Sequence, residues 1–125
     1  HLVSWIKDDI APPTAEPLKV SRMMPQLEFA RDEHGNILGG IRLAEHDVPT
    51  ATNTGFNNGV VNRFCTLYGS HEPFDQETLN FLYPDHNAYL DAIKAVVEKN
   101  LEDGYILPYA AERTIREAEA AALGR

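Results

Sequence analysis

Apolar residues recur at helical spacing near the end of the chain, and this pattern predicts two helices. The first is expected to begin after Asp85, which is a residue type that caps helix N-termini. Gly104 suits the left-handed position that ends many helices, and Pro108 suits the first turn of the next helix. Because residues 105–107 leave only a short link, we expect an antiparallel helical hairpin. The apolar stripe of the first helix consists of Tyr89, Leu90, Ile93, Val96, Val97 and Leu101.

The second predicted helix carries apolar residues on one side and a charged pair on the other. Glu112 and Arg116 stand four positions apart, a spacing at which opposite charges attract on a helix surface. A shorter helix is expected over residues 75–82, with Asp75 as its N-cap. The apolar side of the second helix consists of Ala111, Ile115, Ala118 and Ala122.

The first residues also follow a helical pattern. No capping residue precedes them and the chain begins with His1, so we expect a processed product or a fragment whose helix starts further upstream. Proline cannot continue a helix, so Pro12 and Pro13 end this one. The proline-rich residues 12–26 are expected to form an extended connector. The apolar positions of this helix are Leu2, Val3, Trp5, Ile6 and Ile10.

The middle of the chain combines one strand-like pattern with a long stretch that has no clear period. Turn residues at 32–36 separate two stretches that alternate roughly as strands do, which predicts a β-hairpin. The pair Gly39 and Gly40 indicates a bulge or the close approach of another backbone segment. Residues 44–72 are expected to be irregular, and either functional or packed against another part. The two predicted strands are residues 27–31 and 37–43.

Composition and charge exclude several classes of protein. The 125 residues suit one domain, and 43% apolar and 24% charged residues are ordinary for a soluble chain. The net charge of −8 argues against nucleic acid and anionic membrane surfaces as partners, since both attract basic proteins. No stretch is apolar enough to span a membrane. The single cysteine, Cys65, excludes an internal disulfide, and its apolar neighbours favour a buried thiol over a reactive one.

The residues alone do not reveal a reaction. The chain has no nucleophile elbow, no phosphate-binding glycine loop and no zinc-ligand pattern. A small metal site formed by His71, Glu72 and another histidine is one alternative, although such residues are more often part of a surface loop. Arg42 could bind a carboxylate through both branches of its guanidinium group, although a structural ion pair is its commoner role.

Four stretches resemble, in the same order, a group of large bacterial proteins described as alpha/beta hydrolase domain-containing. Residues 40–57 are similar to the family pattern G-I-R-L-P-E-V-x-V-P-x-A-T-Y-T-G-W-N. Residues 5–13 resemble W-V-x-D-G-x-x-P-P, residues 65–74 resemble C-x-L-x-G-S-x-x-P-F, and residues 87–111 resemble the closing helices and their turn. The chain departs from the pattern where the family has proline, tyrosine and tryptophan. These positions are Ala44, Asn53 and Phe56.

The resemblance implies the C-terminal segment of a serine-type α/β hydrolase, an esterase, whose reactive serine and histidine lie upstream. Residues 1–11 would end the last core helix of the parent fold, and residues 12–26 would connect it to an appendage over residues 27–125. This α+β segment, with a β-hairpin, a long irregular middle and a C-terminal helical hairpin, would pack on the catalytic body and help shape the pocket for a small-molecule ester. Neither a catalytic residue nor a cofactor is expected in it. The candidate pocket residues are Arg42, Asn53, Phe56 and Asn57.

A second interpretation is a non-catalytic binding or assembly module. In that case the predicted helical hairpin would contact a partner protein through its apolar stripe. Association with the upstream part of the hydrolase would favour the first interpretation, and its absence would favour the second.

Overall fold

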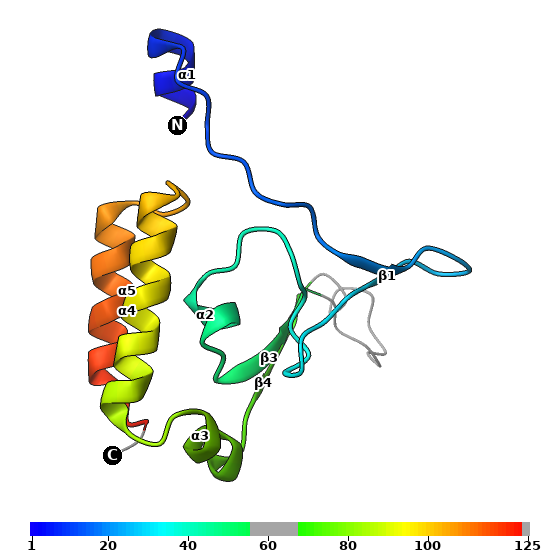
Figure 1. Cartoon of the computed structure of the whole chain (residues 1–125), viewed down its shortest axis with the longest axis vertical. Coiled ribbons are helices and arrows are strands. Elements are labelled where there is room, and N and C mark those ends of the chain that lie inside the picture. The colour runs from blue at the N-terminus through cyan, green and yellow to red at the C-terminus, as the bar shows by residue number, and fades with distance from the viewer. Residues whose placement is uncertain (56–67, 124–125) are drawn as a thin grey trace.

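The computed structural model describes residues 1–55 and 68–123, and Figure 1 shows their arrangement. Two long helices stand side by side, short sheets lie to one side of them, and the N-terminal helix lies beyond their connecting turn. The described residues form two short antiparallel sheets and five helices. The elements are α1 (Leu2–Asp8), β1 (Val20–Arg22), β2 (Glu28–Phe29), α2 (Ala44–Asp47), β3 (Ala51–Thr54), β4 (Ser70–Pro73), α3 (Gln76–Leu82), α4 (His86–Glu102) and α5 (Pro108–Ala120).

The helical hairpin formed by α4 and α5 confirms the predictions made from the end of the sequence. The Asp85 carboxylate accepts a hydrogen bond from the Ala88 N–H at 2.9 Å, as an N-cap does. Gly104 follows α4 with φ at 76°, a left-handed conformation that glycine adopts without steric cost. Pro108 is the first residue of α5. The short helix α3 is capped in the same way, by Asp75.

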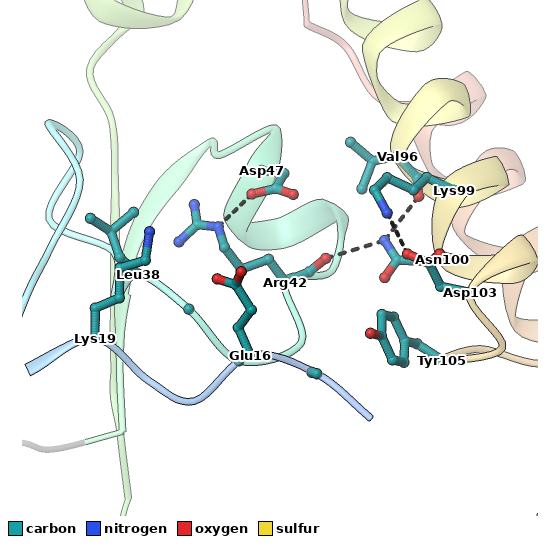
Figure 2. Close-up of a pocket in the computed structure, with 13 residues that line it drawn as sticks. Glu16, Lys19, Leu38, Arg42, Asp47, Val96, Lys99, Asn100, Asp103 and Tyr105 are labelled. Carbon is teal, nitrogen blue, oxygen red and sulfur yellow. Dashed lines mark hydrogen bonds and ion pairs between the residues drawn. The ribbon is translucent and has the colours of Figure 1, made fainter. Parts of the chain in front are cut away.

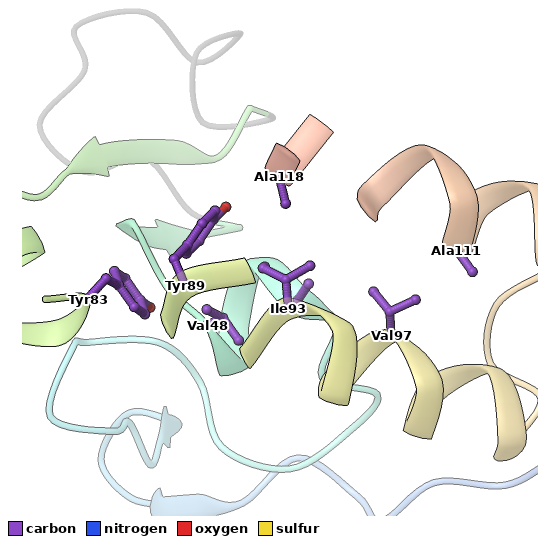
Figure 3. Close-up of a cluster of buried hydrophobic side chains, with 8 residues drawn as sticks. Val48, Tyr83, Tyr89, Ile93, Val97, Ala111 and Ala118 are labelled. Atoms are coloured by element: carbon purple, nitrogen blue, oxygen red, sulfur yellow. The ribbon is translucent and has the colours of Figure 1, made fainter. Parts of the chain in front are cut away.

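A small core forms where α2 and α5 pack against the inner face of α4 (Figure 3). The rings of Tyr83 and Tyr89 meet edge to face, with centroids 5.1 Å apart. The Tyr83 hydroxyl donates a hydrogen bond to the Pro49 carbonyl at 2.9 Å, and burial together with the nearby Tyr89 raises its pKa to about 12. The buried members of this core are Ala44, Val48, Tyr83, Tyr89, Ile93, Val97, Ala111 and Ala118.

One sheet lies inside the segment that was expected to be irregular, so that part of the prediction is wrong. Strands β3 and β4 pair antiparallel, from Ala51 opposite Pro73 to Thr54 opposite Ser70. Of the β3 residues only Ala51 is buried. A strand whose other side chains are threonine and asparagine has no alternation of apolar and polar residues, so the usual signal of a strand is absent.

The predicted β-hairpin is half correct. The turn over residues 32–36 forms, with the Asp32 N–H donating to the Asn36 carbonyl at 2.8 Å. Its second strand pairs with the first only next to the turn, through an antiparallel bridge between Arg31 and Ile37 and a hydrogen bond from the Leu38 N–H to the Ala30 carbonyl at 2.9 Å. Beyond that, β2 pairs with β1, which lies in the proline-rich connector. The chain cannot continue as a strand after Leu38, because Gly39 and Gly40 both adopt positive φ and turn it away.

The glycine pair makes the close backbone contact that the sequence indicated. A Cβ atom on Gly39 would lie 2.3 Å from the Pro17 carbonyl oxygen, so only glycine fits there. The Gly40 N–H donates to the Glu16 carbonyl at 2.9 Å, and the Lys19 N–H donates to the Leu38 carbonyl at the same distance. The connector is therefore attached to the rest of the chain by its backbone.

The N-terminal helix α1 has an uncovered apolar face. None of its residues is buried, and the Trp5 side chain is half exposed. Two contacts join this end to the hairpin turn: the His1 ring bonds to the Gly104 carbonyl at 2.7 Å, and the Tyr105 hydroxyl donates to the Thr14 carbonyl at 2.8 Å. No helix in the described ranges is both long and apolar enough to cross a membrane.

Candidate functional site

Arg42 is the centre of a network that fastens three parts of the chain together. Its guanidinium group forms ion pairs with Asp32, at 2.8 Å, and with Asp47 at the end of α2. It also donates to the backbone carbonyls of Ile37 and His46. The side chains of Arg42 and Asp32 are each less than one-fifth exposed, so the ion pair between them is largely shielded from water. The structural role that the sequence analysis gave as the commoner one is confirmed.

The electrostatics of the network favour its charged form. Burial alone would raise the pKa of Asp32, but hydrogen bonds from Arg42 and from the N–H groups of Asn36 and His34 outweigh it, so the pKa is lowered. Burial also opposes the charge on Arg42, and here the two carboxylates outweigh it and raise its pKa. Both partners are therefore ionised at neutral pH.

The lowered pKa of Asp32 predicts a loss of stability in acid. Its carboxylate stabilises the fold fully above 3.8, the ordinary value for aspartate, and this contribution disappears as the pH falls through the lower folded-state pKa. We expect Asp32→Asn to be less stable than the native chain at neutral pH and to lose less stability below pH 3.8. Urea unfolding at a series of pH values measures this. Asp91→Asn, on the exposed side of α4, is the control and should retain the native profile; equal slopes for the native chain and Asp32→Asn would contradict the prediction.

A cavity of about 450 Å³ lies beside this network, between the connector, the glycine pair and the end of α4. Figure 2 shows Arg42 on one wall, and Lys99 with Asp103 and Tyr105 on the other. Asn100, which is buried, ties the walls together because its side-chain amide donates to the Arg42 carbonyl at 3.2 Å and to the Val96 carbonyl at 2.9 Å. A ligand carboxylate could reach the Arg42 guanidinium only by displacing Asp32 or Asp47.

A second cavity, of about 210 Å³, lies between α2, β3, β4 and the helical hairpin. Asn53 on β3 and His71 on β4 stand on its rim, joined by a 2.8 Å contact between the Asn53 Oδ1 and the His71 Nδ1. The Asn53 amide also donates to the Glu45 carbonyl at 3.3 Å. Strand pairing thus brings together residues that are 18 positions apart in the sequence.

Asn36 holds β3 in place beside the smaller cavity. Its side chain is fully buried, accepts a hydrogen bond from the Asn53 N–H at 2.7 Å and donates to the Ala51 carbonyl at 3.3 Å. The amide side chain therefore satisfies the edge of β3 as a neighbouring strand would. No pattern in the sequence had marked Asn36, because asparagine in a turn has an ordinary local explanation.

The structure places two of the four predicted pocket residues, and they line different cavities. Arg42 lines the larger cavity and Asn53 the smaller one, while Phe56 and Asn57 lie outside the described residues, as does Cys65. The metal alternative gains no support, because in residues 1–55 and 68–123 no three metal-ligating side chains lie close enough to hold an ion.

Several serines and histidines of the described part contact other groups. The Ser21 hydroxyl donates to the Glu28 carbonyl, and Ser70 pairs with Thr54 across β3 and β4. The ring of His86 bonds to the Leu123 carbonyl, and the ring of His34 packs on Phe74 with centroids 5.6 Å apart. In these contacts no serine hydroxyl meets a histidine ring.

A protein-family model described as an alpha/beta hydrolase domain matches residues 1–116 of this chain. That match covers nearly the whole sequence, so the chain belongs to this alpha/beta hydrolase family. The family assigned by resemblance is confirmed. No curated protein and no solved structure matches the chain.

Proposed function

We propose that this chain is the C-terminal portion of a serine-type α/β hydrolase that acts on esters. In this proposal the chain packs on the catalytic body and forms part of the substrate-pocket wall, but it contributes no member of the catalytic triad. Membership of a hydrolase family supports the class of reaction. The observation that carries the packing role is the uncovered apolar face of α1, because a soluble protein rarely leaves such a face unpartnered.

Each part of the chain has its own role in this proposal. Residues 1–11 would be the end of the last core helix of the hydrolase, so the exposed side chains of Leu2, Trp5 and Ile6 would be covered by the catalytic body. Residues 12–26 would connect it to residues 27–125. Arg42, Asn53, Phe56 and Asn57 would belong to the wall that faces the substrate.

A second candidate function is a binding module that uses the helical hairpin. An apolar groove of about 370 Å³ runs along α4 and α5. Leu107 and Tyr109, the neighbours in sequence of its lining residue Pro108, are more than half exposed. Val97, Leu101, Ala111 and Ile115 line it. A partner helix would bury this groove.

Reconstitution with the upstream portion of the hydrolase tests the proposal. We expect the two parts to form a stable complex that hydrolyses p-nitrophenyl esters, whereas this chain alone does not. Trp5→Glu should weaken the complex at least tenfold, because a charge would enter an apolar contact. Lys7→Glu, a change on the same helix, is the control and should bind normally.

The two candidate functions give different results in the same assay. Leu101→Glu should leave the complex intact under the first function, because its side chain lies on the hairpin and not on α1. Weakened binding by Leu101→Glu with no effect of Trp5→Glu would favour the binding module. Ester turnover by this chain alone that disappears in Ser70→Ala would refute the absence of triad residues.

A further inference from the structure

The smaller cavity has an apolar floor and a polar rim. Ala44, Val48, Ile93 and Ala118, which form the floor, belong to the buried core. Glu45 from α2, His71 from β4, and Thr114 and Glu117 from α5 contribute to the rim. A site of this kind holds the apolar body of a small molecule while its polar end stays at the opening.

Tyr89 places an unpaired hydroxyl in this cavity. The residue is only 9% exposed and lines the cavity, yet within the described part of the chain its hydroxyl forms no hydrogen bond. Figure 3 shows the oxygen turned away from Tyr83 and towards Ala118. Burial, and secondly the charge of Glu45, raise the pKa of Tyr89, so the hydroxyl is neutral. Among the described residues no fully buried side-chain nitrogen or oxygen lacks a partner, so this oxygen is open to the cavity, where a ligand can form a hydrogen bond with it.

The charges around the cavity are negative. Glu45 and Glu117 line it, and its lining contains no lysine or arginine. Glu117 has an ion pair with Arg113 at 3.7 Å, but both side chains are well exposed, so solvent weakens that pair. A ligand with a positive charge is therefore favoured over an anion or a neutral molecule.

His71 adds a hydrogen-bond acceptor to the rim. Because the Asn53 amide nitrogen donates to the Glu45 carbonyl, its Oδ1 faces the His71 ring, and the Nδ1 must carry the proton of that contact. With the Nδ1 as donor, the Nε2 is the ring nitrogen that can offer a lone pair to a ligand. The groups that a ligand meets are thus a tyrosine oxygen, two carboxylates and an imidazole lone pair, all of which can accept a hydrogen bond.

We propose that this cavity binds a small primary ammonium ion with an apolar body, such as an alkyl- or arylalkylammonium. The apolar body lies on the floor, and the ammonium group donates hydrogen bonds to the Tyr89 hydroxyl and the Glu45 carboxylate. A primary ammonium has three N–H donors, which matches this set of acceptors. Asn53, which the proposed function assigns to the substrate-pocket wall, also lines this cavity. Binding of the ammonium ion is nevertheless tested on this chain alone and does not require ester hydrolysis.

NMR titration of the 125-residue chain with benzylammonium tests the site. We expect saturable shifts of the backbone amides of Glu45, Asn53, His71 and Tyr89. Tyr89→Phe removes only the unpaired oxygen, so the fold should persist while the affinity falls about tenfold, the usual effect of losing a hydrogen bond to a charged group. Glu45→Gln, on an exposed side chain, should weaken binding about fivefold. Circular dichroism verifies that both variants are folded.

Matched controls separate this site from nonspecific binding. Glu98→Gln removes an acid that does not line this cavity, and it should bind benzylammonium as the native chain does. Benzyl alcohol and benzoate have the same ring without the positive charge, and both should bind at least tenfold more weakly. The proposal is overturned if benzylammonium causes no saturable shifts, if benzyl alcohol binds as tightly, or if Tyr89→Phe and Glu45→Gln both retain native affinity.

Discussion

Replacing Arg42 by methionine is expected to lower the free energy of unfolding by about 3 kcal/mol. Methionine retains much of the side-chain volume but leaves Asp32, Asp47 and two backbone carbonyls without their donor. Removing one partner of a shielded ion pair costs more than the pair contributes, because the remaining charge is stranded. Asp47 is 41% exposed and can be hydrated, which keeps the loss below that of a fully buried network. Urea denaturation at neutral pH measures the change.

An arginine on the surface of the hairpin provides the control for Arg42. Arg116 pairs with Glu112 at 3.8 Å, and both side chains are more than half exposed. Arg116→Met should therefore change the stability by less than about 0.5 kcal/mol. If Arg42→Met proved no more damaging than Arg116→Met, the network would not hold the fold together.

Replacing Asn36 by alanine should have an effect of similar size, about 3 kcal/mol. The substitution leaves the Ala51 carbonyl and the Asn53 N–H without their partners. Because the Asn36 side chain is fully buried, water cannot readily replace it as a partner. Each unsatisfied buried group costs about 1–3 kcal/mol. Hydrogen exchange adds a local test, because the Asn53 amide should lose its protection even where the helical hairpin keeps its own.

An exposed asparagine on α3 is the matched control for Asn36. Asn80 accepts a hydrogen bond from Gln76 at 2.8 Å, and water can replace that contact. Asn80→Ala should stay within about 0.5 kcal/mol of the native chain. Native-like stability of Asn36→Ala would show that β3 does not depend on the Asn36 side chain.

The sequence predicted the helices better than the strands, for physical reasons. The caps of α3 and α4 are local, since Asp75 and Asp85 each bond to an N–H three residues later, and such contacts can be read from residue type and spacing. The sheets depend on distant partners. Val20 was expected in an extended connector but pairs with Phe29 in a sheet, and Thr52 pairs with Glu72. Neither pairing leaves an alternating pattern, because nearly all side chains of these strands stay partly or fully exposed.

The candidate site was only partly predictable. Arg42 and Asn53 were chosen from the family pattern, and the structure places each of them beside a cavity. Tyr89 was assigned to the core by its helical spacing, which is correct, but spacing does not show that its hydroxyl lacks a partner. His71 was interpreted as a surface loop residue, because only the pairing of β3 with β4 brings its ring to Asn53. Glu45 was not singled out.

The only tryptophan of the chain, Trp5, lies on α1 and is half exposed, whereas Tyr83 and Tyr89 lie in the buried core. Its indole emission should shift to shorter wavelength when that helix is covered, because the ring then leaves water. Excitation at the red edge of the absorption band, where the phenol rings hardly absorb, selects the indole over the tyrosines. One intrinsic fluorophore therefore reports docking of the N-terminal helix without a label, while the rest of the chain is followed through different residues.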